Sequence, residues 1–195
     1  MKLPIHNAIL RDSIGKRVSP QALSIITFAN LWQDAIWYQF GHDYIHYDRN
    51  SFKEGDAYLE KERQLIFYSL RKNNIVSAQR AFGRLSHTTQ DFYAHSNYVE
   101  LWREQNPNTP AKEIDPLVND LLNSPRLCSG MLYPPLELLY FVGPLQKLVM
   151  PYIPKDSHAW MNKDDGTKPY FDLAYHAAVK RTVVEFELFC DVWRE

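Results

Sequence analysis

The sequence is poor in cysteine, in glycine and in long apolar runs, and each shortage argues against a class of protein. Its two cysteines, Cys128 and Cys190, cannot build a disulfide framework, so we expect both thiols to be reduced. Seven scattered glycines form no Gly-x-Gly-x-x-Gly pattern, which argues against a phosphate-binding loop of that kind. The longest apolar run lies around residues 138–142 and is far shorter than the roughly 18 residues that a membrane-spanning helix requires.

The chain also lacks an excess of charge of either sign. Its 22 lysines and arginines nearly balance its 23 aspartates and glutamates, which leaves no electrostatic basis for holding a nucleic acid. No apolar stretch of the signal-peptide kind precedes Arg11 and Asp12, so the sequence predicts a cytoplasmic chain, or a secreted one if a leader was removed. A content of 45% apolar and 23% charged residues is typical of a globular domain and excludes general disorder.

Helical signals run along the whole chain and predict one all-α domain over residues 1–195. Ser19-Pro20 predicts a helix start, with a hydroxyl cap and proline in the first turn, and Gly41 predicts the stop. The expected helices cover residues 21–40, 56–72, 75–104, 109–122, 136–141 and 170–193. Six prolines interrupt the pattern within residues 124–157, where we expect an irregular segment that forms a lid or a partner surface.

The most informative segment of the sequence runs from His87 to His95. In a helix, His87, Asp91 and His95 lie four residues apart, and each turns only about 40° past the last, so their side chains share one stripe. Imidazole and carboxylate donors on one face suit Zn²⁺ or a similar divalent ion. A polar stripe on a solvated helix is the alternative, but apolar neighbours such as Phe82 and Phe92 indicate a buried helix, in which these groups need partners.

Other candidate ligands stand alone in the sequence. His6 lies near the start of the chain, where a single histidine is usually solvated. Asp34 lies between two tryptophans in an apolar segment, where a carboxylate is costly without a partner. His42 and His46 follow Gly41 closely, and His158 comes late in the chain.

Two known types of helical metal protein fit less well. The His42-Asp43 doublet is the one that HD-type phosphohydrolases use, but two residues match by chance and leave the stripe unexplained. Carboxylate di-iron bundles need Glu-x-x-His pairs, and no glutamate here has a histidine three residues later.

With these residues in their order, the chain resembles the zinc-dependent phospholipase C and single-strand-specific nuclease superfamily. It is most similar to the Het-C-like branch, which is related to the N-terminal regions of some von Willebrand-A-domain proteins. The stretches that carry the resemblance are Ile5–Ile9, Ala29–Asp34, His46–Phe52, His87–Glu100 and His158–Asp164. The most specific of them contains Gln90-Asp91-Phe92-Tyr93-Ala94-His95-Ser96-Asn97.

The resemblance implies a mostly helical fold that holds two or three zinc ions or another divalent metal. The implied ligands of the first ion are Asp34, His46, His87 and Asp91. His6 and Asp91 share a second ion, and His95 and His158 help to hold a third. Candidates for a weaker ligand or for a residue that supports the ligands are Asp164, Asn162, Asn30 and His42.

Three features depart from the pattern of the superfamily. Asp91 and His95 are closer in sequence than in its lipase and nuclease branches. Asn162 stands where those branches place a carboxylate, although Asp164 is near. The terminal amino group is a ligand in the secreted relatives, whereas Met1 here lies five residues before His6.

The resemblance implies a zinc-dependent phosphoester hydrolase that acts on a lipid headgroup or a small phosphodiester or monoester. Asp34 would then be both a ligand and the general base for the metal-bound water. One alternative is a non-catalytic, metal-stabilised interaction module that uses its Pro-rich segment as a partner surface. Another is metal-assisted, non-hydrolytic chemistry on a diphosphate-type substrate. An open coordination position distinguishes a catalytic site from a closed structural one.

Overall fold

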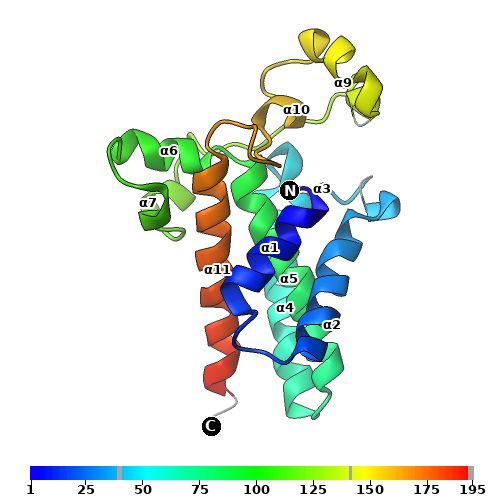
Figure 1. The fold of residues 1–195 in the computed structure, drawn as a ribbon, viewed down its shortest axis with the longest axis vertical. Coiled ribbons are helices and arrows are strands. Elements are labelled where there is room, and N and C mark those ends of the chain that lie inside the picture. Colours follow the sequence, from blue (N-terminus) through cyan, green and yellow to red (C-terminus); the bar gives the residue numbers. More distant parts are fainter. Residues whose placement is uncertain (39–40, 141, 193–195) are drawn as a thin grey trace.

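One buried helix, α5 (Ile75–His95), forms the axis of the fold (Figure 1). The computed structural model describes residues 1–38, 41–140 and 142–192. The helices that pack on α5 are α2 (Pro20–Leu31), α4 (Phe52–Arg71) and α11 (Phe171–Val192), while α1 (Leu3–Ile14) packs on α2 and α11. The described residues contain no β-strand, so the predicted all-α class is confirmed.

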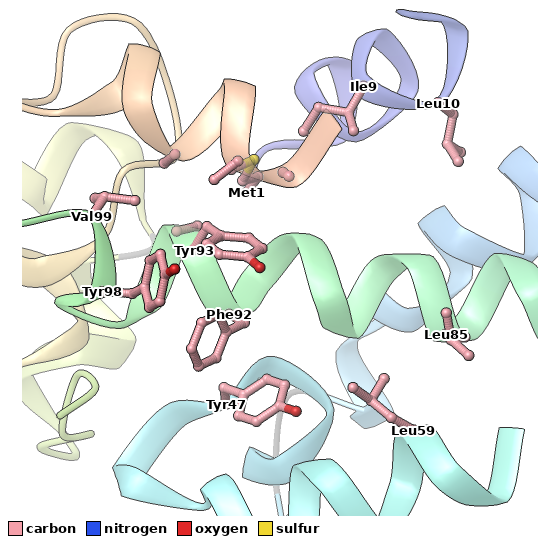
Figure 2. Packing of buried hydrophobic residues seen from close by; sticks show 14 of the residues in the cluster. Met1, Ile9, Leu10, Tyr47, Leu59, Leu85, Phe92, Tyr93, Tyr98 and Val99 are labelled. Atoms are coloured by element: carbon pink, nitrogen blue, oxygen red, sulfur yellow. The ribbon is translucent and has the colours of Figure 1, made fainter. Parts of the chain in front are cut away.

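The core is rich in aromatic rings where α5 meets the next helix, α6 (Tyr98–Gln105). Figure 2 shows Tyr47, Phe92, Tyr93 and Tyr98 packed against one another, with ring centroids 5.0 Å apart for Phe92 and Tyr93 and 5.4 Å apart for Tyr93 and Tyr98. Edge-on packing of this kind suits the charge distribution of aromatic rings. The hydroxyl groups of Tyr93 and Tyr98 donate to backbone carbonyls of residues 116 and 115, so the rings also hold that loop in place.

Local signals predicted several helices correctly. The Ser19 hydroxyl accepts a hydrogen bond from the Ala22 amide at 3.2 Å, which confirms the expected cap of α2. The helices expected over residues 56–72 and 170–193 are present as α4 and α11, with residues 193–195 outside the described ranges.

Two other predicted helices are interrupted in the structure. The helix expected over 21–40 ends at Leu31 and continues as two 3₁₀ turns, η1 (Trp32–Asp34) and η2 (Ile36–Tyr38), before residues 39–40, which lie outside the described ranges. The helix expected over 75–104 breaks at Ser96, whose extended backbone forms an isolated bridge with Ser129.

The prediction of a helix over residues 109–122 is wrong. The segment holds only a 3₁₀ turn, η4 (Ala111–Glu113), and a short helix, α7 (Asn119–Leu122). Pro116 has no amide hydrogen to continue a helix, and the tyrosine hydroxyls take the carbonyls of Asp115 and Pro116.

One end of the bundle carries short elements and a projection. The short elements there are α3 (Asp43–His46), η3 (Asp48–Asn50) and α10 (His158–Met161). The projection, residues 133–156, contains α8 (Leu136–Tyr140), α9 (Gly143–Val149) and η5 (Met150–Tyr152), and we call it the arm. Figure 1 shows the arm standing clear of the bundle beyond α10. Over the described ranges, no helix combines the length and the apolar content needed to cross a bilayer.

The close approach of α2 to α5 predicts the effect of one substitution. A Cβ atom added at Gly83 would lie 2.4 Å from the Ile26 carbonyl oxygen and 2.8 Å from the Ala29 Cβ atom. We expect Gly83→Ala to lower the free energy of unfolding by at least about 1 kcal/mol, because the overlap outweighs the gain in helix propensity. Urea denaturation measures the change. Gly166→Ala is the control, because its Cβ atom would meet nothing closer than 3.9 Å. Equal denaturation midpoints for the two variants would contradict the tight contact.

Candidate metal centre

Histidines and aspartates from distant parts of the chain converge at the end of the bundle that carries α3 and α10. α5 contributes His87, Asp91 and His95, while the other segments contribute His6, Asp34, His46, Asp48, His158 and Asp164. We call these nine residues the centre. All of its residues except Asp34 and Asp164 are classed as buried, and the side chains of those two are each 20% exposed.

The stripe on α5 is present and lies in the interior. His87 and Asp91 are fully buried and His95 nearly so, which excludes the alternative of a solvated polar face. The Nε2 atom of His87 lies 3.0 Å from Asp91 Oδ2, and that of His95 lies 3.9 Å from Asp91 Oδ1. The spacing of four residues therefore places the three side chains together, as the helical period predicts.

Two of the residues expected around a first metal ion, His46 and His87, converge on one oxygen of a third, Asp91. Asp91 Oδ2 lies 2.9 Å from His46 Nδ1 and 3.0 Å from His87 Nε2, and these two nitrogens are 3.2 Å apart. Asp34 Oδ1 approaches His87 Nε2 to 3.8 Å. These separations suit Zn²⁺, because donors bound at about 2.0–2.1 Å in a tetrahedron lie about 3.3–3.4 Å apart.

His6 faces the other oxygen of Asp91, and a hydrogen bond from its second ring nitrogen fixes the orientation of the ring. Its Nδ1 atom donates to the side-chain oxygen of Gln90 at 2.6 Å, and that oxygen also accepts from the Asn30 amide at 3.3 Å. In the neutral ring, Nε2 then carries the lone pair. It lies 3.3 Å from Asp91 Oδ1 and 3.9 Å from Asp34 Oδ2, and it is buried without a hydrogen-bond partner among the described residues.

The third part of the centre surrounds His95. Its Nδ1 atom donates to the backbone carbonyl of His46 at 3.0 Å, which leaves the lone pair of the neutral ring on Nε2. That Nε2 atom lies 3.3 Å from Asp164 Oδ1 and 3.5 Å from the amino group of Met1. The same amino group contacts Asp91 and lies 3.4 Å from Asp164.

Asp48 joins the rings of His95 and His158, and it was not among the residues expected from the sequence. Its Oδ1 atom lies 2.8 Å from His158 Nδ1 and 3.5 Å from His95 Nδ1. Left-handed backbone at Tyr47 and Arg49, with φ of 56° at each, brackets this carboxylate in η3. Its place two residues after His46 was the available signal, but only the turn brings its carboxylate to the two rings.

The four supporting candidates occupy different places. Asp164 lies inside the centre, and Asn30 lies behind it against Gln90. The structure does not bring the other two into the centre. Asn162 donates its amide to two carbonyl groups of α10 at 2.9 Å each, and the His42 ring packs against two tyrosine rings at 5.7 and 6.0 Å.

Histidine rings and the Met1 amino group, not lysine or arginine, surround three carboxylates of the centre. Over the described ranges, the charged or ring-nitrogen partners within 4 Å of Asp48, Asp91 and Asp164 are histidines and the Met1 amino group. Burial alone would lower the pKa of that amino group, but nearby carboxylates outweigh it and raise the pKa to about 11. Burial likewise opposes a charge on His158, and Asp48 outweighs it to raise the pKa to about 9. Protons on these two groups therefore supply positive charge beside the carboxylates.

The pKa values of two other histidines of the centre shift in opposite directions. Burial lowers the pKa of His87 to about 4, so this ring is neutral and available as a ligand at neutral pH. The pKa of His46 is raised, because the hydrogen bond and the charge of Asp91 outweigh the burial of the ring.

A cavity of about 290 Å³ lies elsewhere, on the face of α5 that points away from the centre. Its lining includes Tyr47, Thr89, Phe92 and Arg181. No residue of the centre lines it. The candidate metal donors are therefore separate from this space for a larger ligand.

Comparisons with known proteins identify the family. The family model of the VWA7 N-terminal domain matches residues 4–128, which include every residue of the centre except His158 and Asp164. Von Willebrand factor A domain-containing protein 7 from Rattus norvegicus is 29% identical over 101 residues, which cover 52% of this chain and 11% of that protein. The Homo sapiens protein of the same name is 29% identical over 117 residues, which cover 54% of this chain and 13% of that protein. The chain thus spans a small part of these relatives, and no solved structure matches it.

These matches correct two inferences from the sequence. The assignment to the zinc-dependent phospholipase C and nuclease superfamily, in its Het-C-like branch, is wrong, because the family that matches is a different one. The inferred phosphoester hydrolase is wrong as well, because neither the family nor the relatives carry a hydrolase description. The role of Asp34 as a general base was inferred as part of that hydrolase and is withdrawn with it. The chain belongs to the VWA7 N-terminal domain family.

Proposed function

We propose that this chain is a non-catalytic, metal-stabilised interaction module. The observation that carries the proposal is the buried Nε2 atom of His6. It faces the carboxylates of Asp91 and Asp34 at 3.3 and 3.9 Å, while Gln90 holds the opposite ring nitrogen. A ring nitrogen that faces carboxylates in the interior is favourable only when positive charge, from a proton or from a bound metal ion, lies between them.

The donors suit zinc, with other divalent ions as further candidates. Imidazole nitrogen and carboxylate oxygen are common zinc ligands, and outer groups such as Gln90 and Asp48 typically orient the ligating rings. The first ion would be held by Asp34, His46, His87 and Asp91, the second by His6 and Asp91, and the third by His95 and Asp164 with His158. Bound ions would neutralise the carboxylates and cross-link α1, η1, α3, α5 and α10.

The burial of the centre favours a structural role over a catalytic one. Solvent reaches the side chains of Asp34 and Asp164 only in part, and the cavity on α5 lies on its other face. Catalytic zinc sites keep a coordination position open for water or substrate, whereas structural sites are closed. The family comparison favours the same alternative, since it carries no hydrolase description.

Metal content tests the centre directly. We expect untagged protein to contain two or three equivalents of zinc by mass spectrometry, and Asp91→Asn to contain fewer, because Asp91 faces two sets of donors. Asp120→Asn is the control, because this carboxylate is exposed on α7. The proposal would be refuted if protein that was never exposed to a chelator contained no stoichiometric metal and took up none from added zinc.

Removal of the metal is expected to destabilise the fold. A ligand present at about 100 times its Kd stabilises a protein by about 2.7 kcal/mol, which for a domain of this size is about 5–10 °C in Tm. We expect a chelator to lower the Tm by that amount and added zinc to restore it. Asp91→Asn should respond less than the wild type to both. Turnover of a phosphoester by the zinc-loaded protein, abolished in Asp91→Asn, would contradict the non-catalytic part of the proposal.

Asp48 is expected to act on affinity through the rings that it holds. Because its carboxylate lies against His158 and His95, we expect Asp48→Asn to weaken one zinc equivalent by about 10–100-fold. Competition with a chromophoric chelator measures this affinity. Asp43→Asn is a matched control, since this nearby carboxylate pairs with Arg49 at 3.5 Å outside the centre. Equal zinc release from the two variants would mean that Asp48 has no such role.

A further inference from the structure

The arm exposes large apolar side chains. Tyr152 and Leu148 are 73% and 67% exposed, the highest values among the large apolar residues that the structure describes. Val142 and Leu139 on the same segment, and Trp160 at its base on α10, are also exposed. A segment that is apolar on its outside as well as its inside normally lies against a second surface.

The exposure belongs to an ordered element with a core of its own. Tyr140, Val149 and Ile153 pack with Ala159 of α10 in a small buried cluster. Glu137 is buried beneath it and accepts hydrogen bonds from the backbone amides of Tyr133 and, at 3.0 Å, Ala159. The inner apolar residues of the arm are therefore buried in its own core, whereas the outer ones are exposed and do not contribute to that core.

The charges of the arm indicate what covers it. The arm holds two acidic residues, Glu137, which is buried, and Asp156, which is its last residue, whereas Lys147 and Lys155 are exposed. The Asp156 carboxylate lies at the base of the arm and accepts from the Tyr133 hydroxyl at 2.9 Å. The outer surface thus combines leucine, valine and tyrosine with lysine. This is the composition of segments that lie in the interface of a membrane with anionic lipids.

The shape of the arm agrees with this partner. Figure 1 shows short helices that project beyond the end of the bundle, so the apolar residues lie on a projection and not within the bundle. A projection can insert among lipid headgroups, and tyrosine and tryptophan favour that depth because each has an apolar ring and a polar group. A second copy of the chain would bring like charges together at Lys147 and Lys155.

We propose that the arm binds the surface of an anionic lipid membrane by inserting Leu148 and Tyr152, with Lys147 and Lys155 among the headgroups. The membrane would be the partner of the interaction module proposed above, and the residues of the arm that bind it lie outside the centre.

Co-sedimentation of the full chain with vesicles tests the proposal. We expect binding to phosphatidylcholine vesicles that contain phosphatidylserine, and much weaker binding to phosphatidylcholine alone. The double variant Leu148→Ser, Tyr152→Ser should bind the anionic vesicles about tenfold less well, because it loses two exposed apolar anchors. Lys147→Glu with Lys155→Glu should lose the preference for phosphatidylserine, and salt should weaken wild-type binding.

The control is a double variant of exposed apolar residues away from the arm, also a tyrosine and a leucine. Tyr68→Ser with Leu188→Ser changes side chains that are 62% and 48% exposed on α4 and α11, and it should bind as the wild type does. Zinc content and circular dichroism of every variant verify the fold and separate this test from that of the metal centre. Three results would overturn the proposal: no binding to anionic vesicles, binding that the arm variants leave unchanged, or equal binding to neutral vesicles. Dimerisation that depends on the arm, without vesicle binding, would assign the surface to a second copy instead.

Discussion

The carboxylate of Asp91 is the contact on which this end of the molecule depends. One of its oxygens faces His46 and His87, and the other faces His6 and the amino group of Met1. These partners come from Met1 and from α1, α3 and α5, so one buried side chain contacts elements that are far apart in sequence. A buried carboxylate tolerates no loss of such partners, because an uncompensated charge in the interior is strongly destabilising. The bundle brings the elements near one another, and Asp91 fixes how their ends meet.

What the sequence predicted was local, and what it missed depended on contacts between distant segments. The period of the α-helix was enough to place His87, Asp91 and His95 together, and a hydroxyl before a proline was enough to start α2. The break at Ser96 depends on pairing with residues 128–130, and the position of Asp48 depends on a left-handed turn held by the same segment. No pattern within a single window of sequence carries that information.

The identity of the donors does not determine the chemistry that they perform. The order of the histidines and aspartates along the chain resembles that of a zinc hydrolase superfamily and led us to predict a hydrolase. The family that matches carries no such description. A metal ion bound by the same donors would neutralise their buried charge and join helices, and this needs neither an open coordination position nor a substrate pocket. Burial distinguishes these roles, and burial follows from the packing of the whole chain.

The centre and the arm share α10, which gives a physical route between them. His158, the first residue of this helix, contacts Asp48 in the centre, and Ala159, the next residue, lies in the core of the arm and donates its amide to Glu137. The backbone of His158 also donates to the carbonyl of Met131 at the base of the arm. Neighbouring residues of one short helix thus take part in the two structures. The backbone that presents the ring of His158 to the centre is the backbone that anchors the base of the arm.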